Sequence, residues 1–327
     1  MTEKEKRDWS EKDLRKVIVD QRRFLWRDDM IDRISSSLNL KHGMTAVDVG
    51  CGLGYLGWTF WRHFGEGGTY MGVDCSEKLL TDAREMSEEW SNGGNACFLK
   101  GKAFDIPLQD SFSDLTMCQT LLMHLKKPEA ALAEMIRVTK PGGGVMCMEP
   151  DNLSSSLAVP FSSRPSIDLN ERMFWFKASI IWAEGRKRLG KGDWGIGSKV
   201  PKMMADAGLV RIDCRCNDIP GFIQPPYETE AQRYSMDKMR EHLNERDEEE
   251  KKEEEEKRSW KEYKECFIAG GGSLSTYYRI RKLVEEKRET NKEIILDQVK
   301  SGSYYAGPHP SGFFCFTGFV QDIIENK

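Results

Sequence analysis

In the first half of the chain, short apolar runs alternate with segments of helical periodicity. Apolar, partly β-branched runs occupy 44–49, 69–74, 96–99, 114–118 and 145–148, which is typical of buried parallel strands. Between them, apolar residues recur every three or four positions over 56–64, 77–90 and 128–138, which predicts helices. Strands that alternate with helices predict an α/β fold, in which helices cover both faces of a mostly parallel sheet.

The second half contains two further candidate strands, 210–216 and 312–320, separated by roughly ninety residues, far more than an ordinary loop. This interval carries amphipathic helical patterns and a stretch, 244–259, with no apolar residue. Such a stretch is typical of a solvated helix held by ion pairs four residues apart. An aromatic helix is also expected at 169–189. We therefore expect inserted helical cap segments at 153–198 and 217–310.

One glycine-rich stretch, Val47–Gly57, predicts a strand, a tight turn and the start of a helix. Its last three glycines fit the G-x-G-x-x-G spacing of dinucleotide-binding turns, with an acidic residue, Asp74, at the expected distance. However, a carboxylate at the end of the first strand, Asp48, would repel a pyrophosphate and suits a ligand with a cationic end. Nicotinamide binding and a purely structural turn remain alternatives.

The pattern D-x-G-C-G-x-G from Asp48, followed by Asp74 at the end of the next strand, resembles class I S-adenosylmethionine-dependent methyltransferases. The Lys140–Gly143 turn before an apolar strand is a frequent landmark of these methyltransferases. The segment 200–209 resembles the small-molecule branch related to quinone-biosynthesis enzymes. The resemblance covers about 40–215 and 312–325. It implies a Rossmann-like, seven-stranded, doubly wound sheet whose last strand is antiparallel. The methyltransferase domain would comprise 41–216 and 311–327, with an N-terminal helical lid at 1–40.

The resemblance also implies a site for S-adenosyl-L-methionine. Asp74 would accept hydrogen bonds from the ribose hydroxyls, while Ala103 and Phe104 would bracket the adenine. Lys102 stands where the family has an acidic acceptor for the adenine amino group, and Asp105 is a possible substitute. The expected cofactor-binding residues are Trp26, Arg27, Asp48, Gly50, Gly52, Gly54, Tyr55, Asp74, Cys75, Ala103, Phe104 and Gln119.

Methyl transfer from a sulfonium requires alignment more than a nucleophile or a base. His124 is a candidate general base, although a structural role bonding nearby backbone is the alternative. Trp26 and Arg27 would touch the methionine end of the cofactor, or else would pack at the sheet edge with a solvated arginine.

Composition narrows the class of partners. The net charge is −4 and no basic stripe is present, so we expect no nucleic-acid partner. Nine cysteines lie mostly in predicted strands, which is typical of reduced, buried thiols in a cytoplasmic protein. No CxxC or Cys/His zinc spacing occurs, so no metal is expected, although some related enzymes bind arsenic through thiolates. No apolar run is long enough for a membrane span, and the N-terminus does not resemble a signal peptide.

The sequence therefore predicts a cytoplasmic enzyme that methylates a small-molecule acceptor. Two alternatives remain open. One is a protein or peptide methyltransferase recruited through the charged cap, and the other is a non-enzymatic regulatory module that senses the cofactor. The acceptor, the methylated atom and the oligomeric state cannot be predicted from the sequence.

Overall fold

The computed structural model describes residues 26–90, 93–154, 168–216, 221–244, 249–303, 306–309 and 313–321. The chain divides into two compact units. The first contains the described residues up to Pro150, those of Ile196–Asn217 and those from Phe313 onward. The second contains the described residues of Asp151–Gly195 and Asp218–Gly312. These limits differ by a few residues from the expected insertions at 153–198 and 217–310.

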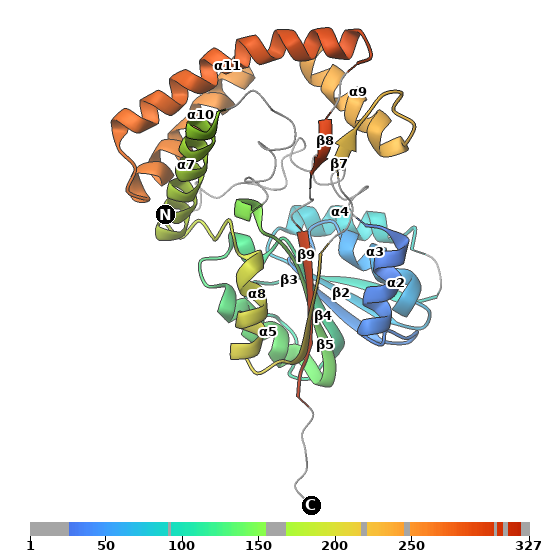
Figure 1. The fold of residues 1–327 in the computed structure, drawn as a ribbon. Helices are drawn as coiled ribbons and strands as arrows, with labels where there is room; N and C mark the ends of the chain where they lie inside the picture. The colour runs from blue at the N-terminus through green and yellow to red at the C-terminus, as the bar shows by residue number, and fades with distance from the viewer. Residues whose placement is uncertain are drawn as a thin grey trace, which may run out of the picture. The chain divides into compact units, whose positions relative to one another are not determined.

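The first unit is built on a seven-stranded sheet with the order β3-β2-β1-β4-β5-β9-β6 (Figure 1). Strands β1 to β5 pair in parallel, and β9 runs antiparallel to both β5 and β6. The predicted α/β class, the seven strands and the antiparallel last strand are therefore confirmed. The strands are β1 (Thr45–Val49), β2 (Thr69–Asp74), β3 (Asn95–Lys100), β4 (Ser113–Gln119), β5 (Thr139–Pro150), β6 (Val210–Cys216) and β9 (Phe313–Phe319).

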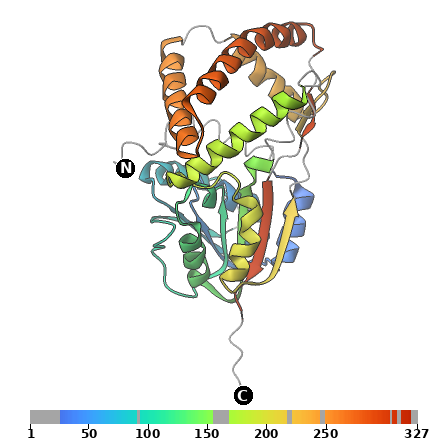
Figure 2. The same ribbon diagram turned by 60° about the vertical axis from the view of Figure 1, so that its left-hand side comes forward.

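Helices lie on both sides of this sheet. In Figure 1, α2 and α3 lie on one side and α5 and α8 on the other. In Figure 2, α8 lies across β9 and β6, which are hydrogen-bonded neighbours. The helices are α2 (Asp28–Ser37), α3 (Tyr55–Phe64), α4 (Glu77–Ser87), α5 (Pro128–Val138) and α8 (Val200–Asp206), with short 3₁₀ turns at Leu122–His124 and Gly197–Lys199.

The apolar periodicity of the sequence explains the packing of these helices. Met30, Ile31 and Ile34 of α2 recur on one face and are buried with Phe60 of α3. The α4 helix starts where it was predicted, because the Ser76 side chain accepts a hydrogen bond from the Leu79 N–H at its N-terminus. It ends at Ser87, three residues before the predicted end.

One strand is longer than predicted. The expected strand at 145–148 is part of β5, which already begins at Thr139 and includes the Lys-Pro-Gly-Gly-Gly stretch. Thr139 pairs with Ser113 before the register with β4 shifts. Its buried hydroxyl lies 2.6 Å from that of Thr116, which in turn lies 2.7 Å from that of Ser113. This hydroxyl chain stabilises an early pairing that the glycines alone do not indicate.

The described residues of the second unit form several helices and a small sheet. The helices are α7 (Leu169–Arg188), α9 (Glu230–Asn244), α10 (Glu249–Ala269) and α11 (Leu274–Lys300). Strands β7 (Gly221–Ile223) and β8 (Ala306–His309) pair antiparallel. The expectation of purely helical insertions is therefore incomplete, because residues near the two ends of the second insertion form a two-stranded antiparallel sheet.

The α7 and α10 helices approach each other unusually closely. A Cβ atom on Gly185 would lie 1.6 Å from the Cys266 carbonyl oxygen, and one on Gly270 would lie 1.8 Å from the Ile181 carbonyl oxygen. The close approach of these two segments therefore depends on glycine at positions 185 and 270. Around this contact the aromatic residues of the predicted cap helices form an apolar cluster with buried Phe267, Tyr277 and Ile280.

Candidate cofactor site

The glycine stretch forms a tight turn between β1 and α3. The Val73 carbonyl of β2 accepts hydrogen bonds from the N–H groups of Gly50, at 2.7 Å, and Cys51, at 3.1 Å. Gly50, Gly52 and Gly54 all have positive φ angles, which L-residues with side chains rarely adopt. The turn therefore lies beside the end of β2 and requires its glycines for conformation.

Tyr70 contacts the residues on both sides of the glycine turn, Asp48 before it and Gly57 after it. A Cβ atom on Gly57 would lie 2.1 Å from the Tyr70 ring, so only glycine allows α3 to approach β2 this closely. The Tyr70 hydroxyl donates a 2.8 Å hydrogen bond to Asp48 Oδ2. Asp48 is only 1% exposed. Burial, followed by the Asp48 charge, raises the pKa of Tyr70 well above its usual value. Sequence reasoning missed Tyr70, since no spacing relates it to Asp48.

Asp74 connects the turn to the loop after β2. Its Oδ2 accepts a 3.0 Å hydrogen bond from the Gly52 N–H, and its Oδ1 accepts a 2.9 Å hydrogen bond from the Ser76 N–H. Each carboxylate oxygen retains a lone pair, and the side chain is only partly buried. Beside it, a Cβ atom on Gly52 would meet no atom within 4 Å. The carboxylate therefore lies beside open space at the carboxyl end of β2.

The end of β4 carries the next predicted residue, Gln119. Its side chain is 8% exposed, and its Nε2 is buried without a hydrogen-bond partner among the described residues. Thr120 follows with a φ of +50°, a strained value for a β-branched residue. Leu121 then reaches the glycine turn, because a Cβ on Gly50 would lie 2.8 Å from Leu121 Cδ1. The loop after β4 thus contacts the turn after β1.

The residues expected at the adenine lie in a loop after β3. The Lys102 carbonyl accepts a 3.0 Å hydrogen bond from the Asp105 N–H, which closes a turn around Ala103 and Phe104. The Phe104 ring is 57% exposed, and Lys102 Nζ lies 5.9 Å from its centroid. Ala103 is partly buried and Asp105 is exposed. The loop therefore offers an uncovered aromatic face with a cation beside it.

The remaining predicted residues lie in varied settings. Tyr55 begins α3 and is partly buried, whereas Cys75 is exposed directly after Asp74. Trp26 packs edge-on against Phe60 at 5.3 Å, and Arg27 is exposed with its Nε 3.1 Å from Asp29. His124 ends the 3₁₀ turn after β4, where its backbone N–H donates to the Leu121 carbonyl.

The cysteines do not all lie where the sequence indicated. Cys118, Cys147 and Cys315 are buried in the sheet as predicted, but Cys214 and Cys216 on the edge strand β6 are exposed. The prediction was wrong for these two because an edge strand is covered less than a central one. Among the described residues, no group of three or more His, Cys, Asp or Glu side chains is arranged to hold a metal ion. No helix in the described ranges is long and apolar enough to cross a membrane.

These features fit S-adenosylmethionine. Gly52 leaves room for a ligand that a side chain would fill, and Asp74 presents free acceptor lone pairs beside that room. Gln119 Nε2 is a buried donor with no partner in the part of the chain that the structure describes, and a ligand acceptor would satisfy it.

Comparison with known proteins gives the same class. Residues 40–194 match the model of a family described as a methyltransferase domain. An uncharacterized methyltransferase of Schizosaccharomyces pombe is 39% identical over 116 residues, which are 33% of this chain and 41% of the relative. A demethylmenaquinone methyltransferase of Staphylococcus aureus is 30% identical over 136 residues, 42% of this chain and 54% of the relative. The chain thus spans about half the length of these curated relatives.

Among solved structures, that of a putative sarcosine dimethylglycine methyltransferase from Galdieria sulphuraria is 15% identical. The match covers 91% of this chain and 85% of that one, with a TM-score of 0.46. The family match agrees with the sheet order and the glycine turn, which are those expected of a class I methyltransferase domain. Over residues 40–194 the chain is thus similar to methyltransferase domains, and part of it is similar to a relative named as a demethylmenaquinone methyltransferase.

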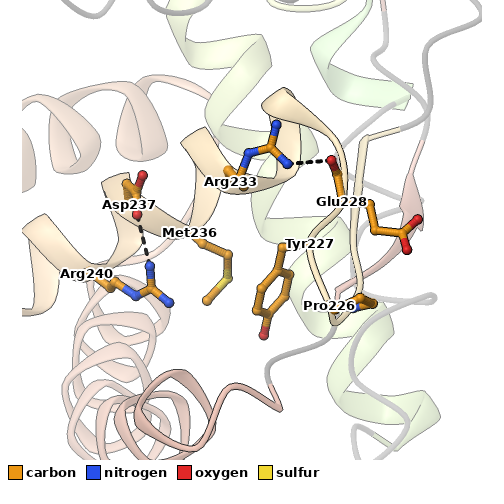
Figure 3. Close-up of a pocket in the computed structure, with 7 residues that line it drawn as sticks. All are labelled: Pro226, Tyr227, Glu228, Arg233, Met236, Asp237 and Arg240. Carbon is orange, nitrogen blue, oxygen red and sulfur yellow. Dashed lines mark hydrogen bonds and ion pairs between the residues drawn. The ribbon is translucent and has the colours of Figure 1, made fainter.

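The second unit contains a separate pocket of about 300 Å³, shown in Figure 3. Arg233, Met236, Asp237 and Arg240 line it from one face of α9, and the loop before that helix supplies Tyr227 and its neighbours. Arg240 pairs with Asp237 at 2.9 Å, and Arg233 donates to the Glu228 carbonyl. Two arginines and two acidic residues line this pocket, so its formal charges balance. The net charge of the lining therefore favours neither an anionic nor a cationic ligand.

Proposed function

We propose that this protein transfers a methyl group from S-adenosylmethionine to a small-molecule acceptor. The observation that carries this proposal is the Asp74 carboxylate, which holds the Gly52 N–H at 3.0 Å and lies beside the open space over Gly52. The same carboxylate can accept hydrogen bonds from two adjacent hydroxyls, such as those of a ribose. The domain match over residues 40–194 supports the cofactor assignment.

Different residues of the proposed site would bind different parts of the cofactor. Asp74 would hold the ribose, and the exposed Phe104 ring with Ala103 would cover the adenine. Asp48 lies buried under the turn with one oxygen on Tyr70, so it would act on the cationic end of the cofactor mainly through its field. Gln119 Nε2 would donate to an acceptor at the methionine end. Tyr55, Cys75, Trp26 and Arg27 are proposed as further contacts.

The chemistry requires little else from the chain. The sulfonium of the bound cofactor already makes its methyl group electrophilic. The protein must then hold the acceptor in line with the breaking bond and keep water away from it. His124, one turn beyond β4, is the candidate general base where the acceptor carries a proton to be removed.

A small-molecule acceptor is favoured by the relatives. The second relative reported above is named for methylation of demethylmenaquinone, a small molecule, and this chain shares 30% identity with it over 136 residues. We also propose a cytoplasmic location and no nucleic-acid partner, in keeping with the net charge of −4.

Calorimetry with S-adenosylmethionine, S-adenosylhomocysteine and NAD tests the cofactor assignment. We expect the first two to bind and NAD not to bind. Asp74→Ala should weaken binding by at least about tenfold, because buried ligand hydroxyls would lose their acceptor. Asp206→Ala is the matched control, since among the described residues that carboxylate pairs with Lys202 on the exposed face of α8. Binding of NAD alone would refute the assignment.

The acceptor is tested separately, by transfer of labelled methyl groups from the cofactor to fractionated metabolite extracts and to denatured and native protein extracts. Label in a small-molecule fraction supports the proposal. Label only in protein would favour the alternative of a protein methyltransferase, and tight cofactor binding without any transfer would favour a sensor of the cofactor.

A further inference from the structure

Glu149, near the end of β5, is a fully buried carboxylate with an exposed fraction of 0%. It lies directly behind the loop that follows β4. Its Oε1 accepts hydrogen bonds from the Leu121 and Leu122 N–H groups, each at 2.8 Å. Its Oε2 accepts a third, from the Met123 N–H at 3.2 Å. These bonds show that the carboxylate caps the loop.

The loop that Glu149 holds is strained. Thr120 has a φ of +50°, a value that a β-branched residue rarely adopts. Its N–H donates to the Met148 carbonyl at 2.8 Å, so the strained residue is tied to β5 beside Glu149. A strained conformation persists only where its surroundings determine it. The three bonds to Glu149 constrain the residues that directly follow Thr120.

The held loop supports the cofactor site at two points. Leu121, whose N–H is fixed by Glu149, places its side chain against Gly50, where an added Cβ would lie 2.8 Å away. Gln119, on the other side of Thr120, holds its partnerless Nε2 in a buried position. Displacement of the loop would therefore move both the support of the glycine turn and the buried donor.

We propose that Glu149 is a positioning residue for the cofactor: through the Leu121–Met123 backbone it sets the place of Gln119 and of the glycine turn. This inference rests on the proposed cofactor binding, and it adds a residue that would touch neither cofactor nor acceptor. Its carboxylate accepts hydrogen bonds from the N–H groups of the partly buried Leu121 and the buried Leu122 and Met123. Without it these donors would lose an acceptor in a largely buried place.

Calorimetry with S-adenosylhomocysteine on Glu149→Gln tests the inference. A carboxamide turns one acceptor oxygen into a donor, which opposes the Met123 N–H. We expect a dissociation constant about tenfold higher than in the unmodified protein. Leu121→Ala is the second variant, because it keeps the Glu149 bonds but removes the side chain from Gly50. We expect a severalfold loss of affinity with a folded protein, so the inference stays testable if Glu149→Gln does not fold.

Asp114→Asn is the matched control. This carboxylate accepts a 2.8 Å bond from the Thr45 N–H and a 2.7 Å bond from Lys140 Nζ at the start of β4, the opposite end of the sheet from the site. We expect it to lower the melting temperature without changing the affinity for S-adenosylhomocysteine. Unchanged affinity in Leu121→Ala and in folded Glu149→Gln, or an equal loss in Asp114→Asn, would refute the role. Failure of the unmodified protein to bind would instead refute the proposed function.

Discussion

At the scale of single residues, two glycines of similar conformation differ in what surrounds them. Gly52 has a φ of +53° in the turn beside Asp74, and Gly67 has a φ of +64° in the turn before β2. A Cβ atom on either would meet no atom within 4 Å. Their substitution therefore carries the same kind of backbone cost, but only Gly52 borders the proposed cofactor.

We expect Gly52→Ala and Gly67→Ala to destabilise the protein by similar amounts, about 1 kcal/mol, because alanine disfavours a positive φ. Gly52→Ala should in addition abolish most binding of S-adenosylhomocysteine, since its methyl group occupies the open space. Urea denaturation and calorimetry on both variants measure the two effects. Equal affinities in the two variants would show that the ligand does not lie over Gly52.

At the scale of elements, the contact between α7 and α10 depends on small residues. Gly185 of α7 lies so close to α10 that an added Cβ would reach 1.6 Å from the Cys266 carbonyl oxygen. Backbone atoms cannot yield as a flexible side chain can, so a larger residue must separate the helices. The aromatic cluster around Phe267, which these helices share, would then lose its packing.

Gly185→Ala should therefore destabilise the second unit by about 2–4 kcal/mol, despite the better helix propensity of alanine. Glu184→Ala, at the neighbouring exposed position of α7, is the control and should change stability by less than about 0.5 kcal/mol. Chemical denaturation followed by tryptophan fluorescence measures both. If Gly185→Ala were neutral or stabilising, the helices would not be in this contact.

At the scale of the whole molecule, the nine cysteines report which parts of both units are covered. Cys51, Cys118, Cys147, Cys266 and Cys315 are buried, Cys97 is half-buried, and Cys75, Cys214 and Cys216 are exposed. Burial, followed by the nearby Asp48 and Asp74 charges, raises the pKa of Cys51 well above its usual value. Burial likewise raises the pKa of Cys266. Buried thiols of raised pKa hold little reactive thiolate.

Brief alkylation of the native protein at pH 8, read by mass spectrometry, should modify Cys75, Cys214 and Cys216 first, and the five buried thiols only after unfolding. S-adenosylhomocysteine should protect Cys75, which follows Asp74, but neither cysteine of β6. Fast labelling of Cys51 in the native protein would contradict the buried turn. Equal labelling of Cys75 with and without the ligand would remove Cys75 from the proposed site.

Much of the first unit could be predicted from the sequence, since its strands and helices have local causes. Each parallel strand is a short apolar run between turn residues, and α4 begins at a serine that caps it. The glycine turn and Asp74 could be predicted because their roles need particular residue types at short separations. The small sheet of β7 and β8 could not be predicted, because its strands are short and lie far apart in the sequence.

The sequence by itself determined the order of strands and helices, the glycine turn and the acidic residue beside it, because these depend on local backbone preferences and on periodicity. Only the tertiary structure decided which residues contact one another. It placed Tyr70 on Asp48, Leu121 on Gly50, and Glu149 behind the loop after β4. Such contacts join residues distant in sequence, and their partners depend on strand register and packing, which no spacing along the chain records.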